Sequence, residues 1–196
     1  MDRKIGVIAS DMELKNTFMQ LFAKEVSRGN MIIDILNSDN MEEQGRILES
    51  KGAKAIIARS GGYRHTIGKV NVPVVNLKIT TLDILYAIKT ARKYRKDIIL
   101  LISDMEYFDY DEWKDMINEK VIVERFLDNE NIEDRVRKYA ERREDIVIVG
   151  GGIPCACARK FGMSNVHIGA SDESIFKAVS HLSLIHISEP TRRSYI

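Results

Sequence analysis

Two glycine-rich corners in this sequence have residue types suited to holding a small anion. The first is "ARSGGY" at Ala58–Tyr63 and the second is "VGGGIP" at Val149–Pro154. Each follows a short apolar run, and glycine lets the backbone turn sharply and bring N–H groups close to an anion. Neither corner has the spacing of a dinucleotide-binding or P-loop motif. A strand-to-helix turn that holds no ligand is the alternative interpretation.

Hydroxyl residues end predicted strands or begin predicted helices in both halves of the chain. Ser10 and Ser103 end strands, and the aspartate after each of them is expected to cap the next helix. Thr80 and Ser171 begin helices, whose N–H groups and positive dipole ends attract carboxylates. Capping by these hydroxyls is the alternative, and the two roles are compatible.

Cations near the two corners are unevenly distributed. Arg59 lies beside the first corner and Lys78 ends the next apolar run, whereas the matching residues in the second half are Gly150 and Gly169. A guanidinium binds a carboxylate through two hydrogen bonds, so the pattern predicts a site for a small anionic metabolite. Solvated or acid-paired cations are the alternative. The candidate ligand-binding residues are Ser10, Arg59, Ser60, Gly61, Gly62, Tyr63, Lys78, Thr80, Ser103, Gly150, Gly151, Gly152 and Ser171.

The two cysteines, Cys155 and Cys157, are expected to pack as small apolar residues at a helix start. Two-lobed α/β racemases use one cysteine from each lobe, but the residue that matches Cys155 in the first half is Arg64. A CxC pair with four scattered histidines also lacks the spacing of a metal site. We therefore predict no catalytic residue, no metal and no cofactor. The alternative is a racemase or lyase in which Cys155 is the nucleophile or base.

The elements that must position these residues are short apolar runs alternating with amphipathic helical patterns. Most runs are apolar throughout, which favours parallel strands covered on both faces. Helices are predicted over Met12–Gly29, with Gly29 as the cap, and over Asn131–Glu144. The predicted strands are Ile5–Ser10, Met31–Asn37, Lys54–Ala58, Val74–Ile79, Ile98–Ser103, Val121–Phe126, Ile146–Val149 and Val166–Gly169.

Three matches in the same order indicate an internal duplication of about ninety residues. "IGVIASDME" from Ile5 aligns with "IILLISDME" from Ile98, and "AIIARSGG" aligns without gaps with "IVIVGGGI", which places Gly61 on Gly152. "TTLDILYAI" from Thr80 aligns with "SDESIFKAV". Two unrelated α/β units with generic patterns are the alternative.

The duplication predicts two α/β/α lobes, each with a parallel sheet of about four strands. Lobe one comprises residues 1–79 with a returning helix at 171–181, and lobe two comprises 80–170. The helices that begin at Thr80 and Ser171 would cross between the lobes and form a hinge. Ligands of open α/β sheets bind beyond the carboxyl ends of the strands, so we expect the ligand in a cleft between the lobes.

Composition excludes several classes of protein. The 196 residues contain 30 Lys+Arg and 29 Asp+Glu, with no basic block of the kind that binds nucleic acid and no apolar run long enough to cross a membrane. The N-terminus lacks a signal peptide, and the sparse cysteines suggest a reducing compartment. We therefore expect a cytoplasmic protein.

Taken together, these motifs resemble the N-terminal sensor domain of propionate catabolism activators, which belong to the sigma-54-dependent transcriptional regulators. The resemblance is strongest over Gly52–Arg92 and Ile146–Val179. The family's arginine, its proline-led strand with a lysine, and its helix-opening aspartate match Arg59, Pro73, Lys78 and Asp83 here. Ser60 and Tyr63 depart from the family's "SRGGT"-like corner.

The resemblance implies a sensor that binds a small organic acid and is not itself an enzyme. In founding members the ligand is a methylcitrate-type tricarboxylate. Ligand binding would control an AAA+ ATPase that remodels sigma-54 RNA polymerase, with a helix-turn-helix that binds DNA and an oligomeric full-length protein. Those domains lie outside this sequence. A stand-alone binding protein is a further alternative.

The C-terminal segment gives a reason for this absence. "LSLIHISEPTR", from Leu182 to Arg192, is what a common transposase sequencing adapter gives when it is translated in this frame. We therefore interpret residues 182–196 as a non-native tail that cuts the returning helix short. A genuine polar tail is the alternative.

Overall fold

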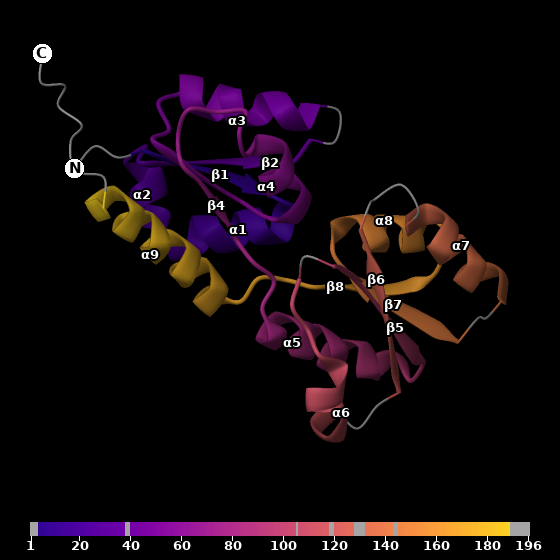
Figure 1. The fold of residues 1–196 in the computed structure, drawn as a ribbon. Coiled ribbons are helices and arrows are strands. Elements are labelled where there is room, and N and C mark those ends of the chain that lie inside the picture. The colour runs from indigo at the N-terminus through magenta and orange to yellow at the C-terminus, as the bar shows by residue number, and fades with distance from the viewer. Residues whose placement is uncertain are drawn as a thin grey trace, which may run out of the picture. The chain divides into compact units, whose positions relative to one another are not determined.

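The chain folds into two compact units, described here from a computed structural model (Figure 1). The structure describes residues 4–37, 40–104, 106–117, 120–127, 132–142 and 145–188. Unit 1 comprises the residues up to Lys78 together with those from Asp172 onward, and unit 2 comprises Ile79–Ser171. Within these described ranges, no helix is long and apolar enough to span a membrane.

Unit 1 contains a four-stranded parallel sheet with helices on both faces (Figure 1). Its strands are β1 (Ile5–Ala9), β2 (Met31–Ile35), β3 (Ala55–Ala58) and β4 (Val74–Asn76), in the order β2-β1-β3-β4. Its helices are α1 (Met12–Leu21), α2 (Ala23–Ser27), α3 (Met41–Ser50), α4 (Ser60–Thr66) and α9 (Asp172–Ser188). All four β3 residues are buried, as the uninterrupted apolar run "AIIA" predicts.

The single helix predicted over Met12–Gly29 is wrong, because it breaks into α1 and α2 at Phe22. Phe22 has φ −118° and ψ 36°, outside the helical region. Its ring lies 6.0 Å from that of Phe18 and 5.5 Å from that of Phe176 on α9, measured between centroids. The break thus occurs at a residue that packs between two helices of the unit.

Unit 2 repeats the topology of unit 1, which confirms the predicted duplication of two α/β lobes. Its strands are β5 (Asp97–Ser103), β6 (Val121–Phe126), β7 (Ile146–Gly150) and β8 (Ser164–His167), all parallel, in the order β6-β5-β7-β8. Its helices are α5 (Thr81–Ala91), the 3₁₀ turn η2 (Arg92–Tyr94), α6 (Tyr110–Ile117), α7 (Ile132–Arg142) and α8 (Gly152–Lys160). Helix α7 matches the helix predicted over Asn131–Glu144.

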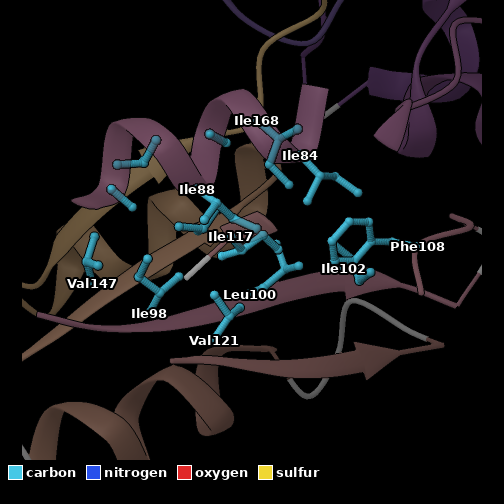
Figure 2. Packing of buried hydrophobic residues seen from close by; sticks show 14 residues of the cluster. Ile84, Ile88, Ile98, Leu100, Ile102, Phe108, Ile117, Val121, Val147 and Ile168 are labelled. Carbon is cyan, nitrogen blue, oxygen red and sulfur yellow. The ribbon is translucent and has the colours of Figure 1, made fainter. Parts of the chain in front are cut away.

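Alternate residues of β5 enter separate cores on the two faces of the unit 2 sheet. Ile98, Leu100 and Ile102 pack with Ile84 and Ile88 of α5 (Figure 2). The intervening residues of β5 pack beneath α7 and α8 with the apolar residues of those helices. A strand buried on both faces needs no polar alternation, which is why the sequence reads as a continuous apolar run.

Backbone hydrogen bonds give the correspondence between the two repeats. Leu77 N donates to Ala58 O at 2.8 Å, and Ile168 N donates to Gly150 O, also at 2.8 Å. Ala58 therefore corresponds to Gly150. The ungapped alignment of the sequence matched Arg59 to Gly150 and is one residue out at this corner.

The corrected register also changes the partners of the corner residues. Arg59 and Gly151 both occupy the N-cap of the helix that follows the third strand of their sheet. Ser60, rather than Gly61, therefore corresponds to Gly152. A one-residue gap between this corner and the fourth strand reconciles the two halves.

Helix α9 extends past the point where the tail was predicted to begin. It runs from Asp172 to Ser188, so it is not interrupted at Leu182, which is buried. The segment between Leu182 and Ser188 contains no glycine or proline, and Pro190 is the first helix breaker. The adapter origin of residues 182–196 stays a prediction, and residues 189–196 lie outside the described ranges.

Candidate functional site

The strand order defines one switch point in each unit. From β1 the chain moves first to β2 on one side and then to β3 on the other, so the connections after β1 and β3 diverge. The same holds for β5 and β7 in unit 2. In open parallel sheets, ligands bind beyond the carboxyl ends of the two strands at such a point. The residues after β1 and β3, and after β5 and β7, are therefore the candidate positions.

Ser10 and Asp11 follow β1 and serve the start of α1. Asp11 Oδ1 accepts a hydrogen bond from Leu14 N at 2.8 Å, which confirms the predicted cap. Ser10 Oγ donates to Asp11 Oδ2 at 2.7 Å. Ser10 lies at the switch point, with its hydroxyl proton committed to the capping carboxylate.

Arg59 follows β3 and is the cation of this switch point. The residue is only 5% exposed, in extended backbone at the N-cap of α4. Burying a guanidinium is unfavourable unless it is paired, so a buried arginine needs anionic or carbonyl acceptors around it. Its fork of N–H donors matches a carboxylate in geometry.

Ser60, and not a glycine, takes the strained conformation at the first corner. Its φ is +46°, in the left-handed region. Gly61 and Gly62 have no left-handed φ, and neither do the three glycines of the second corner. The prediction that these glycines permit the turn is therefore wrong, because each has backbone angles that other residues can adopt.

Gly61 is open to its surroundings, whereas the next two residues pack toward the core of unit 1. A Cβ on Gly61 would meet no atom within 4 Å, so this position is open. Gly62 is buried, and a Cβ added there would lie 3.4–3.8 Å from side-chain atoms of Leu36, Ile8 and Ala58. Tyr63 packs against the same core cluster. All three residues belong to the first turn of α4, in which Gly61 is open while Gly62 and Tyr63 pack toward the core.

Lys78 and Asn76 lie at the end of β4, one strand beyond the switch point. Lys78 is exposed. Asn76, which was not among the residues predicted from sequence, pairs with Ala58 in the sheet, next to Arg59. Its Oδ1 atom is buried and has no hydrogen-bond partner among the described residues. The sequence signal that could have identified Asn76 is a polar residue at the end of an apolar strand. His167 occupies the matching position in β8.

The unit 2 switch point carries Ser103, Gly151 and Gly152. Gly151 and Gly152 are open, since a Cβ on either would meet no atom within 4 Å. Gly150 is buried inside β7, where a Cβ would lie 2.7 Å from Pro154 Cβ and 2.9 Å from Leu101 O. Gly150 is therefore a packing residue.

The cap predicted for Asp104 is wrong. Among the described residues, the first helix after β5 is α6, which starts only at Tyr110. Asp104 is exposed and its N–H donates to Phe126 O at 3.0 Å. At the start of α6, the side chain of Asp109 rather than that of Asp104 accepts a backbone hydrogen bond, from Asp111 N to Asp109 Oδ1 at 3.0 Å.

Thr80 and Ser171 have backbone N–H groups that are already hydrogen-bonded to an internal carboxylate. Thr80 N donates to Asp83 Oδ2 at 2.9 Å within a capping box, and Ser171 N donates to Asp83 Oδ1, also at 2.9 Å. Asp83 is 3% exposed. These N–H groups are thus satisfied by the protein, and Asp83 occupies the place predicted for a ligand carboxylate.

Neither cysteine has the setting of an activated nucleophile. Cys155 is 1% exposed and its Sγ lies 3.5 Å from Gly150 O, as expected for a packed residue. The residue of unit 1 that matches Cys155 is Tyr63, not Arg64. Tyr63 and Cys155 each stand four residues after the N-cap of their helix and donate their N–H to the carbonyl of that N-cap. Burial and then the nearby Glu133 carboxylate raise the pKa of Cys157. Among the described residues, no three His, Cys, Asp or Glu side chains form a cluster that could bind a metal.

Comparison with known proteins assigns the family. A model of the family described as propionate catabolism activator matches residues 31–185. The chain therefore belongs to the propionate catabolism activator family, and it is a sensor domain of a transcriptional regulator. No curated protein matches this sequence.

Comparison with solved structures gives one match that shows the same fold over nearly the whole chain. An NtrC family transcriptional regulator from Clostridium acetobutylicum superposes with a TM-score of 0.80 at 22% identity, over 95% of this chain and 98% of that one. An ABC domain in complex with L-Trp from Streptococcus pneumonia gives a TM-score of 0.49 at 11% identity, over 97% and 87% of the two chains. The first match supports the two-sheet α/β fold.

Proposed function

We propose that this sensor domain binds a small carboxylate effector, and that Arg59 receives the carboxylate. The observation that carries the proposal is a buried guanidinium at the switch point of unit 1, in a chain whose family regulates transcription. Ser60, Gly61 and Lys78 would complete the anion site, since all of them follow strand ends on the same edge of the sheet. Ser10 lies on that edge too, but its hydroxyl proton is donated to Asp11.

Asn76 adds a preference for an effector that carries a hydrogen-bond donor. Its buried Oδ1 lies on the strand that pairs with the end of β3, next to Arg59. A buried acceptor without a partner is costly, and a ligand hydroxyl would satisfy it. The proposed ligand class is therefore a hydroxylated organic acid. The sequence-based expectation that unit 2 contributes Ser103, Gly151 and Gly152 to the same ligand remains a prediction.

A thermal-shift screen tests the ligand class directly. Citrate and tricarballylate differ by one hydroxyl and share three carboxylates, and the trimethyl ester of citrate removes the charges. The proposal expects a rise in Tm that follows mass action for citrate, a smaller rise for tricarballylate and none for the ester. If neutral compounds raise Tm as much as acids across a broader panel, the carboxylate proposal fails.

The same proposal makes the domain a binding protein without catalysis. Cys155, the residue that the enzyme alternative requires, is buried within α8 and hydrogen-bonded to Gly150 O. The variant Cys155→Ser should therefore keep acid affinity within about twofold. Turnover of a bound acid that is lost in this variant would establish the enzyme instead.

We also propose that the domain controls an AAA+ ATPase and a DNA-binding domain encoded downstream, with residues 182–196 contributed by a sequencing adapter. Family membership and the translated adapter sequence support this proposal. Sequencing the source locus past codon 181 should show the frame continuing into a P-loop and then a helix-turn-helix. A stop codon within a few tens of residues would favour the stand-alone binding protein.

A further inference from the structure

The chain passes between the two units at two places, and both are held by buried carboxylates of unit 2. The outward crossing lies between Lys78 and Ile79, and the return crossing lies between Ser171 and Asp172. Any reorientation of the units must change backbone dihedrals at these crossings. The contacts of the crossing residues therefore determine where a hinge can act.

The Asp83 carboxylate accepts hydrogen bonds from the backbone of both crossing segments. Its Oδ2 accepts from Thr80 N and its Oδ1 accepts from Ser171 N, each at 2.9 Å. Residues 83 and 171 are 88 positions apart in sequence. One buried carboxylate thus joins the outward and return segments, using a different oxygen for each.

Glu106 provides a second hold on the outward crossing. It is 6% exposed, and its Oε2 accepts from Ile79 N at 3.3 Å. Arg125 donates to Glu106 O at 2.9 Å and to Phe108 O at 2.5 Å, which fixes the loop that carries this carboxylate. Two consecutive residues of the outward segment are therefore hydrogen-bonded to unit 2.

On the unit 1 side, the outward segment is held up to the residue before Lys78. Leu77 N donates to Ala58 O at 2.8 Å. The residue before Lys78 is hydrogen-bonded to unit 1 and the residue after it, Ile79, is hydrogen-bonded to Glu106 of unit 2. Lys78, which is exposed, is thus the one residue between these two bonds. On the return segment, Ser171 is held by Asp83, and α9 of unit 1 begins at Asp172.

The other repeat has no carboxylate at the position of Asp83. The residue that corresponds to Asp83 in α9 is Ser174, which is also buried, at 5% exposure. A serine has neither the negative charge nor the second oxygen that Asp83 uses. We infer that Asp83 is a positioning residue that fixes both crossings to unit 2, so that reorientation of the units occurs at Lys78 and at the Ser171–Asp172 linkage.

Amide hydrogen exchange in the unmodified chain tests the clamp. Ser171 lies outside regular secondary structure, yet its amide should exchange at least about tenfold more slowly than an open loop amide, because its acceptor is a buried charged group. Thr80 should behave in the same way, whereas Lys78 should exchange rapidly. If the Ser171 amide exchanges at the rate of an open loop, the inference is overturned.

The variant Asp83→Asn tests the shared acceptor, with Asp115→Asn as the matched control. A carboxamide has one acceptor oxygen, so at least one of the Thr80 and Ser171 amides must lose its partner. Exchange at that amide should accelerate about tenfold or more, while the control, an exposed aspartate on α6, leaves both amides unchanged. Unchanged exchange at both amides in a folded Asp83→Asn protein contradicts the clamp.

Distances between spin labels on the two units test the position of the hinge. Labels at exposed Ser50 of α3 and Glu141 of α7, with the native cysteines replaced by alanine, should give a broader distance distribution in Asp83→Asn than in the unmodified background. Lys78→Gly should also broaden it while leaving Ser171 exchange unchanged. If Lys78→Gly and Asp83→Asn both leave the distribution unchanged, the hinge does not lie at these residues.

Discussion

Ser60 shows how a single residue at the candidate site departs from what its sequence context indicates. The first corner offers two glycines, but the left-handed φ of +46° falls on the serine before them. A side chain in this region costs about 1–2 kcal/mol relative to ordinary backbone. The family's typical corner, as inferred from resemblance, has glycine directly after the arginine, where this chain has Ser60.

Replacing Ser60 with glycine should stabilise the domain by roughly 0.5–1 kcal/mol, because relief of φ strain exceeds the added entropy of the unfolded chain. Urea denaturation checks this value. Gly61→Ala is the matched control: its φ is ordinary and its Cβ would meet open space, so the change should be small. Loss of stability in Ser60→Gly, or a large loss in Gly61→Ala, would place the strain at the glycines after all.

Gly150 carries the opposite prediction, because it is a glycine that packing requires. Alanine there would put a Cβ 2.7 Å from Pro154 Cβ and 2.9 Å from Leu101 O, so the variant should lose about 1–3 kcal/mol of unfolding free energy. Gly151→Ala, one residue on, should be tolerated. Equal losses in chemical denaturation for the two variants would contradict this assignment.

At the scale of elements, the sequence predicted the strands well and the corners poorly. Short apolar runs predicted all of β1 through β8, with only their ends displaced, and the inner strands β3 and β7 are buried throughout. The break of a helix at Phe22 could not be predicted, because it depends on packing against Phe176, far away in the chain. The role of Asp83 was also hidden, since its partner Ser171 becomes adjacent only through the fold.

The α7–α8 surface makes a prediction about pH. A hydrogen bond from Lys160, at 2.7 Å, and further interactions with Arg137 lower the pKa of Glu133 below its usual value. Because the folded pKa is lowered, the stabilising contribution is complete above the unfolded pKa and is lost as pH falls through the folded one.

An NMR titration of the Glu133 carboxyl should therefore have its midpoint below that of an unstructured glutamate. Lys160→Ala should raise this midpoint. Lys177→Ala, which removes the partner of Glu173 on α9, should leave it unchanged. An unchanged Glu133 midpoint in Lys160→Ala would rule out the stated cause.

At the scale of the whole molecule, the two units differ in continuity. Unit 2 is one continuous segment with an apolar core on each face of its sheet, whereas unit 1 needs α9, whose Ile175, Ala178 and Leu182 are buried. Residues 79–171 alone should unfold cooperatively, and residues 1–78 alone should not.

Adding a peptide of residues 172–188 to residues 1–78 should restore part of the native circular dichroism and a cooperative melt. Cooperative unfolding of residues 1–78 without the peptide would show that α9 is dispensable to unit 1. The duplication itself was predictable from three aligned segments. The correct match of Arg59 to Gly151, rather than to Gly150, could be found only from the backbone hydrogen bonds.

The central claim is that the buried guanidinium of Arg59 binds the carboxylate of an effector. Isothermal titration calorimetry tests this claim most directly. The best acid from the thermal-shift screen is titrated into the unmodified domain, into Arg59→Gln and into the control Arg28→Gln. Arg28 is an exposed arginine of unit 1 that lies outside the candidate site. The account predicts a loss of affinity of at least about tenfold for Arg59→Gln, partial recovery in Arg59→Lys and no change for Arg28→Gln. Unchanged affinity in a folded Arg59→Gln protein would contradict it.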